Sequence, residues 1–179
     1  MLVIGIDPGI IITGIGIIEA EKNILKPIFY DAIKLDKYSY FPTRLKVIYD
    51  NILEKIDQYK PDEFAIETVF YGKNIQSALK IGQARGVAFL AAMQREIPAN
   101  EYSPREIKKA VTGNGSASKE QVSYMVKNIL KLRKVPKLFD ATDALAVAIC
   151  HHNRMTSPRS KFTDWKSFIE ANPEKIINK

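Results

Sequence analysis

Two short runs of apolar, mostly β-branched residues open the chain and predict two buried strands. The first run covers residues 2–6 and the second covers residues 13–18. Neither run alternates with polar residues, which is typical of strands buried on both faces. Between them Asp7, Pro8 and Gly9 form a turn signal, and Pro8 favours an extended backbone at Asp7.

The carboxylate at the end of the first strand is the first candidate for chemistry. Asp7 stands at the last position of a buried strand, where an unpaired carboxylate costs several kcal/mol unless a partner or a metal compensates it. Gly9, Gly14 and Gly16 leave room for another group to approach the backbone closely. Aspartate also caps turns of this kind, so the stretch alone leaves a capping role and a functional role open.

The pattern next predicts an edge strand, a helix and a fourth strand. Residues 24–35 form a strand pattern interrupted by Pro27, and a proline inside a strand argues for an edge position or a bulge. Residues 43–59 repeat their apolar positions with the helical period, so this helix has one buried face. Residues 64–66 form a short apolar strand that ends on Glu67.

Helices dominate the second half of the chain. A long helix is expected over residues 75–95, and its Gly82 and Gly86 weaken it unless another backbone packs against them. The Ser-Pro-Arg-Glu sequence from residue 103 has the spacing of a capped helix start. The remaining elements are a strand over residues 100–102 and helices over residues 104–111 (with Ser103 as the cap), 119–132 (with Ser118 as the cap) and 141–152.

The last helix carries two further acidic residues. Asp140 and Asp143 are three apart and share one face at its N-terminal end. The helix is otherwise almost wholly apolar and must be buried, so both aspartates point into the core or along its rim. Asp140 has a second interpretation as an N-cap that interacts with the helix dipole. Capping does not need a second carboxylate at Asp143.

Together the four acidic residues predict a metal site. Asp7 and Glu67 end strands that can lie side by side and parallel, and the helix with Asp140 and Asp143 can pack across those ends. Like charges at this distance repel strongly, so a positive charge belongs among them. Oxygen ligands without cysteine favour Mg²⁺ or Mn²⁺. Two such ions, about 3.5–4 Å apart, can clamp the attacking water and the leaving oxygen of a phosphodiester.

Composition limits the class of protein. The chain has 179 residues, of which 46% are apolar and 26% are charged, as in an ordinary soluble domain. No run reaches the roughly 18 apolar residues of a membrane span, and the N-terminus lacks a signal-peptide pattern. The single cysteine, Cys150, excludes a disulfide within the chain and a cysteine-based zinc cluster. We expect a cytoplasmic protein that does not bind a membrane.

Basic residues gather in one segment, residues 104–137. The net charge of +7 is weak evidence for an anionic partner by itself, but in this segment only Glu106 and Glu120 oppose the basic residues. These basic residues are Arg105, Lys108, Lys109, Lys119, Lys127, Lys131, Arg133, Lys134 and Lys137. A solvated helical face is one explanation. A phosphate-binding surface is the explanation we favour, and beside the predicted metal site it indicates a nucleic-acid substrate.

Five ordered blocks of the sequence resemble the RuvC family of Holliday-junction resolvases, which are RNase H-like nucleases. The resemblance runs from Met1 to about His152. The blocks are IGIDPG at residues 4–9, FAIETVFYGKN at 64–74, SALKIGQARGVA at 77–88, GNGSASKEQV at 113–122 and DATDALAVAICH at 140–151.

The resemblance implies an α/β fold of the RNase H-like class. This fold has a five-stranded mixed sheet, whose first three strands are antiparallel, flanked by helices. The nuclease domain would cover residues 1–153, followed by a polar tail over residues 154–179 with one amphipathic turn around Trp165. The resemblance further implies a homodimer that cuts two opposing strands of a four-way DNA junction symmetrically, in recombination and repair. Two Mg²⁺ ions per site, with Mn²⁺ as a substitute, and the branch-migration proteins RuvA and RuvB are the implied cofactors and partners.

The resemblance also assigns roles to single residues. The family's catalytic, metal-binding acids fall on Asp7, Glu67, Asp140 and Asp143. The candidate DNA-binding residues are Phe70, Tyr71, Lys73, Asn74, Arg105, Lys108 and Lys119. Among these, Phe70 matches the family's base-stacking aromatic, and Lys108 and Lys119 match its phosphate-contacting lysines. Packing under the loop is the other interpretation of Phe70, because most phenylalanines lie in the core.

Two other functions stay open. The strand-turn-strand opening followed by Thr-Gly also resembles the first phosphate loop of the actin and sugar-kinase ATPases, although the chain is short for two such lobes and has no second phosphate loop. A junction-binding protein without catalysis is the other possibility, and the presence of all four acids argues against it. His151 and His152, at the predicted end of the last helix, are expected to interact with its dipole rather than to bind metal.

Overall fold

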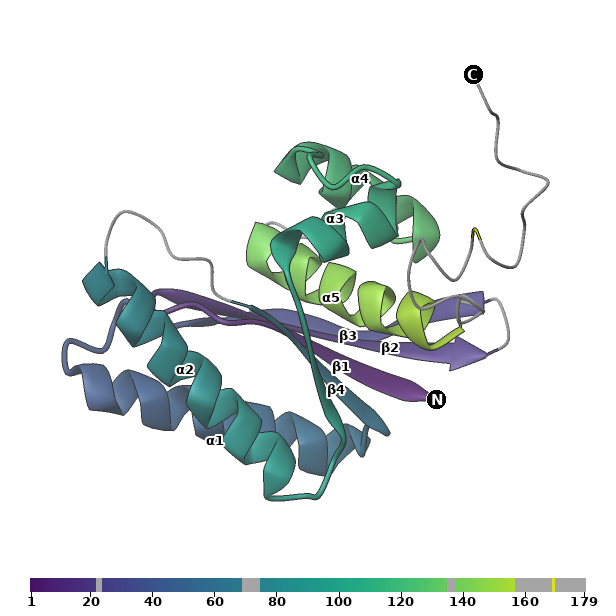
Figure 1. Ribbon diagram of the computed structural model, residues 1–179. Coiled ribbons are helices and arrows are strands. Elements are labelled where there is room, and N and C mark those ends of the chain that lie inside the picture. Colours follow the sequence, from purple (N-terminus) through teal and green to yellow (C-terminus); the bar gives the residue numbers. More distant parts are fainter. Residues whose placement is uncertain (22–23, 69–74, 135–137, 157–168, 170–179) are drawn as a thin grey trace.

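A mixed five-stranded sheet forms the centre of the molecule in the computed structural model (Figure 1). The structure describes residues 1–21, 24–68, 75–134, 138–156 and 169. The strands are β1 (Leu2–Asp7), β2 (Ile12–Glu21), β3 (Ile24–Lys34), β4 (Glu63–Glu67) and β5 (Ala99–Tyr102). Their order is β3-β2-β1-β4-β5; β1 to β3 are antiparallel, and β4 and β5 run parallel to β1. The predicted mixed sheet is confirmed.

Helices cover both faces of this sheet (Figure 1). On one face lie α1 (Phe41–Tyr59) and α2 (Ile75–Met93). On the other face lie α3 (Pro104–Thr112), α4 (Lys119–Ile129) and α5 (Phe139–Thr156), with α5 directly against the sheet. This is the flanked sheet expected of an RNase H-like fold. None of the described helices is both long enough and apolar enough to span a membrane.

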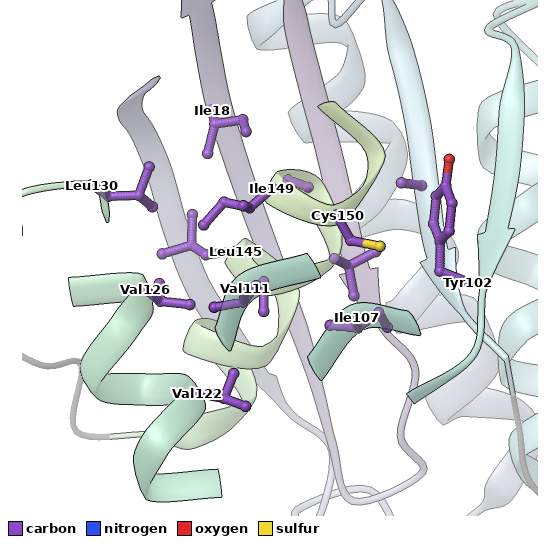
Figure 2. Packing of buried hydrophobic residues seen from close by; sticks show 14 of the residues in the cluster. Ile18, Tyr102, Ile107, Val111, Val122, Val126, Leu130, Leu145, Ile149 and Cys150 are labelled. Carbon is purple, nitrogen blue, oxygen red and sulfur yellow. The ribbon is translucent and has the colours of Figure 1, made fainter. Parts of the chain in front are cut away.

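Each face of the sheet has its own apolar core. Val3, Ile18 and Ala65 join the cluster that α3, α4 and α5 complete (Figure 2). Their chain neighbours Ile4 and Phe64 belong to the second cluster, with α1 and α2. Adjacent residues of a strand face opposite sides of a sheet. A central strand that is covered on both faces therefore needs an uninterrupted apolar run, which is what β1 and β2 have.

Glycines let α5 lie against the backbone of β1 and β2. A Cβ atom at Gly5, Gly14 or Gly16 would collide with backbone atoms of α5. At Gly14 the obstructing atom is the carbonyl oxygen of Asp140, and at Gly16 the nearest atom is the backbone nitrogen of Leu145, 2.7 Å away. The close approach predicted at two of these glycines is confirmed, and the approaching group is the helix that carries two of the four acids.

α5 is longer at both ends than its apolar pattern predicts. It begins two residues before and ends four residues after the predicted range 141–152. Asp140 therefore lies inside the first turn, and its interpretation as an N-cap is wrong. His151 and His152 are buried in the helix interior, and burial lowers the pKa of both imidazoles. Neutral rings away from the helix end do not interact with the dipole, so that prediction is also wrong.

Two other helices end earlier than predicted. α2 ends at Met93 and α4 ends at Ile129, two and three residues before the expected ends. Glu96 and Lys131 follow them in the left-handed conformation, with φ of 54° and 51°, and such residues commonly terminate helices. The usual sequence signal for this conformation is glycine or asparagine, which both positions lack.

β3 is the edge strand that Pro27 predicts. Ile18 of β2 faces Pro27, and the pairing register shifts between Ile17 and Ile18. The edge position and the bulge are both confirmed. Proline has no N–H group to donate, and an edge bulge is where a sheet tolerates that loss.

The contact between α5 and the sheet can be tested with two matched glycine substitutions. In Gly16→Ala all three nearest atoms to the new methyl are backbone atoms of α5, whereas in Gly115→Ala the nearest atom is Arg105 Cγ, with the Arg105 carbonyl oxygen at 3.2 Å; the nearest atom lies 2.7 Å away in both cases. Backbone within a packed helix cannot yield as a side chain can. We expect Gly16→Ala to lower the free energy of unfolding in urea by about 1–3 kcal/mol or more, and Gly115→Ala to lower it by clearly less. Equal losses would mean that the backbone contact does not set the packing.

Candidate active site

Asp7 and Glu67 lie at the C-terminal ends of β1 and β4, which are neighbouring parallel strands. Ile6 of β1 pairs with Ile66 of β4, so the two acids that follow lie at the same level. Side chains two apart in a strand share a face. Asp7 therefore lies on the face of Gly5, which α5 covers. The sequence prediction that the strands ending on these two acids lie side by side and parallel is confirmed.

A buried threonine closes the turn that follows Asp7. The Thr13 hydroxyl donates a hydrogen bond of 2.7 Å to the Gly9 carbonyl oxygen, and the Gly9 N–H donates to the Thr13 hydroxyl at 3.3 Å. Thr13 is 1% exposed. These bonds satisfy the turn without the Asp7 side chain, which removes the need for Asp7 as a turn cap.

A cleft of about 90 Å³ opens between these strand ends and helices α3, α4 and α5. Ligand pockets for drug-sized molecules are several times larger, so this cleft has room for ions and a few small groups. It is lined by Asp7, Glu67, Asp143, Lys108, Lys119, Pro104, Ile107 and Val122. The three apolar residues form a wall that the sequence did not point to, because Ile107 and Val122 also belong to the core.

The carboxylates of the cleft are held in an unfavourable environment. Burial raises the pKa of Asp7 well above its usual value, and the charges of Glu67, Asp143 and Asp140 raise it further. Burial, followed by the charge of Asp143, raises the pKa of Glu67 to about 7. Asp140 is absent from the cleft lining, but its backbone lies against Gly14, the residue of β2 that pairs with Asp7. The four acids predicted from sequence thus influence one another across three separate elements.

Two lysines partly compensate these charges. Lys119 Nζ lies 3.3 Å from Asp143 Oδ2, and its charge lowers the pKa of Asp7, Glu67 and Asp143 against the effect of burial. The Lys108 charge acts in the same direction on Glu67 and Asp143. Two lysines do not balance four carboxylates, so among the residues that the structure describes the acids lack matching positive charge.

The donor set suits a hard divalent cation. Its donors are carboxylate oxygens, the ligands of Mg²⁺ and Mn²⁺. The histidines do not compete, since His151 Nε2 lies 3.5 Å from Glu63 Oε2, at the start of β4, about 13 Å along the strand from Glu67. Within the described ranges no three His, Cys, Asp or Glu side chains form a ready-made cage for an ion. An ion would therefore have to draw the carboxylates together.

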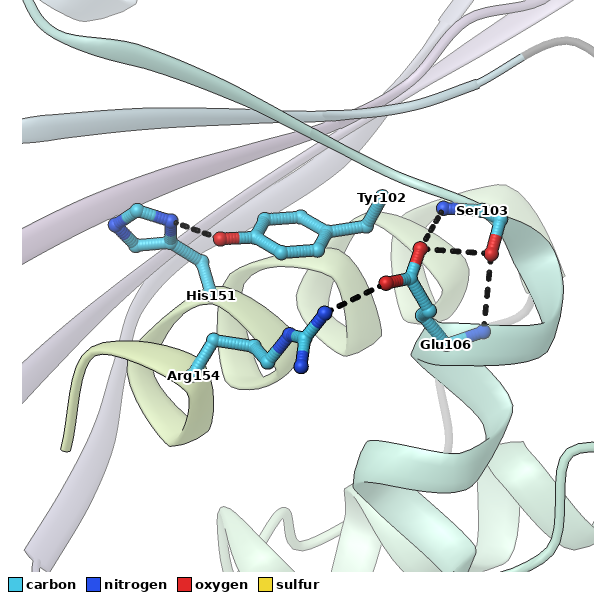
Figure 3. Close-up of polar contacts among 5 residues, drawn as sticks. All are labelled: Tyr102, Ser103, Glu106, His151 and Arg154. Atoms are coloured by element: carbon cyan, nitrogen blue, oxygen red, sulfur yellow. Dashed lines mark hydrogen bonds and ion pairs between the residues drawn. The ribbon is translucent and has the colours of Figure 1, made fainter. Parts of the chain in front are cut away.

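A polar network anchors α3, the helix that presents Lys108 (Figure 3). Ser103 and Glu106 form a capping box, in which the Ser103 N–H donates to the Glu106 carboxylate at 3.0 Å and Glu106 N–H donates back to the Ser103 hydroxyl at 3.3 Å. Arg154 of α5 donates to the same carboxylate at 2.7 Å. The capping serine was predicted from sequence. The contact with Arg154 was not, because Arg154 is 48 residues from Glu106 and no local pattern links them.

A second bond ties the end of β5 to α5. The Tyr102 hydroxyl lies 2.9 Å from His151 Nδ1 in the interior, and the Tyr102 carbonyl accepts from the Thr68 N–H at 2.9 Å. Thr68 directly follows Glu67. The buried histidine thus supports the strand ends beside the acid cleft, a role that the sequence did not reveal.

One further predicted DNA-binding residue, Arg105, is not brought into the cleft. It lies on a different side of α3, where it lines a separate cleft with Lys109 and Gly115. Phe70, Tyr71, Lys73 and Asn74 lie outside the described residues.

Comparison with known proteins agrees with this geometry. The family model described as crossover junction endodeoxyribonuclease RuvC matches residues 3–151. Proteins of that name from Christiangramia forsetii and Salinibacter ruber are 46% and 44% identical over 98% of this chain, and the matches cover 92% and 99% of their own lengths.

Solved structures give the same result. Thermus thermophilus RuvC, alone and in complex with a Holliday junction substrate, superposes with TM-scores of 0.78 and 0.80 at 32% identity. Both matches cover 87% of this chain and 96% of the Thermus chain. The fold, the acid cleft and these relatives lead to one conclusion: the chain belongs to the RuvC family of crossover junction endodeoxyribonucleases, whose activity depends on divalent metal ions.

Proposed function

We propose that the acid cleft is the site at which this endonuclease hydrolyses phosphodiesters of a Holliday junction. The observation that carries the proposal is the convergence of Asp7, Glu67 and Asp143 from β1, β4 and α5 on one small cleft. Asp140 completes the set through its charge on Asp7. These four carboxylates would hold two Mg²⁺ ions, for which Mn²⁺ can substitute. When bound, such ions activate water and stabilise the leaving oxygen.

The remaining residues of the cleft position the substrate. Lys108 and Lys119, at its rim, are placed to bind phosphate oxygens on either side of the cut bond. The apolar wall of Ile107 and Val122 limits the number of water molecules beside the carboxylates, which strengthens every charge interaction there. We further propose that Arg105 and the segment with Phe70, Tyr71, Lys73 and Asn74 contact the junction outside the cleft.

Family membership decides between this function and the other two. The ATPase interpretation rested on the first turn alone, and the family match extends to residue 151. A binding protein without catalysis would not need buried carboxylates that raise one another's pKa, because such a cluster is unfavourable without cations.

We also propose that the protein is a homodimer, paired through α2. Symmetric incision of two strands needs two acid clefts, and the described part of each chain presents one candidate. The outer side of α2 is apolar, with Leu79 64% exposed and Leu90 55% exposed. A Cβ at Gly82 or Gly86 would meet nothing within 4 Å. These glycines weaken a lone helix, and a second α2 packed against them explains their presence.

The same family relationship supports proposals about the partners and the location of the protein. RuvA and RuvB are the proposed partners, and the cytoplasm is the proposed location. The division into a nuclease domain over residues 1–153 and a tail over residues 154–179 stays a proposal, with α5 extending three residues past that boundary.

Loss of one acid should abolish cleavage and spare binding. Asp7→Asn keeps the shape of the side chain and removes the charge that holds the metal ions, so the rate of junction cleavage in Mg²⁺ should fall by about a thousandfold or more, equivalent to several kcal/mol. Gel-shift affinity for the junction should change little. Asp50→Asn, on the exposed side of α1, is the control and should cut normally. Near wild-type cleavage by Asp7→Asn would exclude the four-acid site.

The repulsion within the cleft predicts an unusual pH dependence of stability. The folded pKa of Glu67, about 7, lies above its unfolded value of about 4.3. Between these values the native state binds more protons than the unfolded state, so the contribution of Glu67 to the free energy of unfolding falls as pH rises. Without metal, Glu67→Gln should be more stable than wild type at pH 8, and the difference should vanish by pH 4. Thermal melts in EDTA across this range test it; a constant difference would argue against the shift.

The dimer proposal predicts a change of mass without a loss of fold. Leu90→Glu puts a charge on the outer side of α2, where it is compatible with a solvated helix but not with an apolar interface. Analytical ultracentrifugation should show monomers, with the circular dichroism spectrum unchanged. Ile24→Glu, at an exposed apolar position of β3, should remain dimeric. If the Leu90→Glu variant remains dimeric, the interface does not lie on α2.

A further inference from the structure

An ion pair crosses the acid cleft from α4 to α5. Lys119, the first residue of α4, places Nζ 3.3 Å from the Asp143 carboxylate. We infer that Lys119 occupies the place of a cation in the acid cleft and competes with divalent metal ions for Asp143. This inference rests on the proposed metal-dependent function of the same cleft, and it gives Lys119 a second role besides phosphate contact.

The position of Lys119 in its helix supports this role. The N-terminus of a helix carries partial positive charge, which disfavours a lysine there. Ser118 and Gln121 already form the capping box of α4, so the helix start does not need Lys119. The side chain gains from the carboxylates instead, because the charge of Asp143, followed by those of Asp7 and Asp140, raises the pKa of Lys119.

The exposure of the two partners favours exchange. The Lys119 side chain is 67% exposed, whereas that of Asp143 is 17% exposed. Lysine can therefore leave into water at small cost, while Asp143 left alone would be a poorly solvated carboxylate among other carboxylates. An ion pair with one exposed partner is weak. Lys119 thus partly neutralises Asp143 without metal, and a divalent cation can displace it and free it to bind a phosphate.

Lys108 offers a matched comparison. It lines the same cleft and its charge acts on Glu67 and Asp143 in the same direction. Within the described part of the chain, however, it has no carboxylate within ion-pair distance. Removing either lysine removes one positive charge near the metal site, but only removal of Lys119 frees Asp143.

The test is titration of the metal-free full chain with MgCl₂ and with MnCl₂ in the absence of DNA, by calorimetry and by thermal melts. We expect Lys119→Gln to bind metal roughly threefold to tenfold more tightly than wild type and to gain more melting temperature from it. Lys108→Gln should show a clearly smaller gain. Lys119→Arg, which keeps the charge, should remain near wild type. Both glutamine variants should bind the junction more weakly.

Unchanged or weaker metal binding by Lys119→Gln would overturn the inference, as would equal tightening by both glutamine variants. Failure of the underlying function looks different. If neither metal stabilises the wild-type chain, and Asp7→Asn behaves identically, the cleft is not a metal site and both proposals fail. Circular dichroism confirms that each variant is folded before titration.

Discussion

The structure depends on the direct contact between the backbone of α5 and the glycines of β1 and β2. Without a Cβ at Gly5, Gly14 or Gly16, the helix approaches the sheet more closely than side chains would allow. This contact fixes the height and the rotation of α5 together. Asp140 and Asp143 lie at the start of that helix, so the position of two carboxylates relative to Asp7 and Glu67 follows from where glycine occurs in two strands.

The acid cleft works against the stability of the fold that surrounds it. Both apolar clusters gain from burial, whereas the carboxylates of the cleft are buried with too little compensating charge from the described residues. A protein keeps such an arrangement where function requires it. Away from the carboxylates, Arg154 anchors α3 through Glu106, and His151 anchors β5 through Tyr102.

Much of this could be predicted from sequence where a local pattern determines the structure. The uninterrupted apolar runs of β1 and β4 place Asp7 and Glu67 at strand ends, and Pro27 marks the edge strand. The contacts that could not be predicted are those between residues distant in sequence. No local sequence pattern shows that Arg154 contacts Glu106 or that His151 is buried against Tyr102. Nor does any local pattern show that Lys119, rather than Lys109, contacts Asp143. Lys108 and Lys109 are neighbours of the same type, and only packing of α3 decides which one faces the cleft.

The bulge at Pro27 has a consequence for how copies of the chain can associate. An exposed edge strand offers its free N–H and C=O groups as a template on which another sheet can grow. In β3 the proline removes a donor and the register shift twists the strand locally, while Lys26 adds a charge beside it, 3.6 Å and 3.5 Å from Glu19 and Glu21. Open-ended strand-to-strand polymerisation through β3 is therefore blocked. The β3 edge of the sheet is thus protected from aggregation.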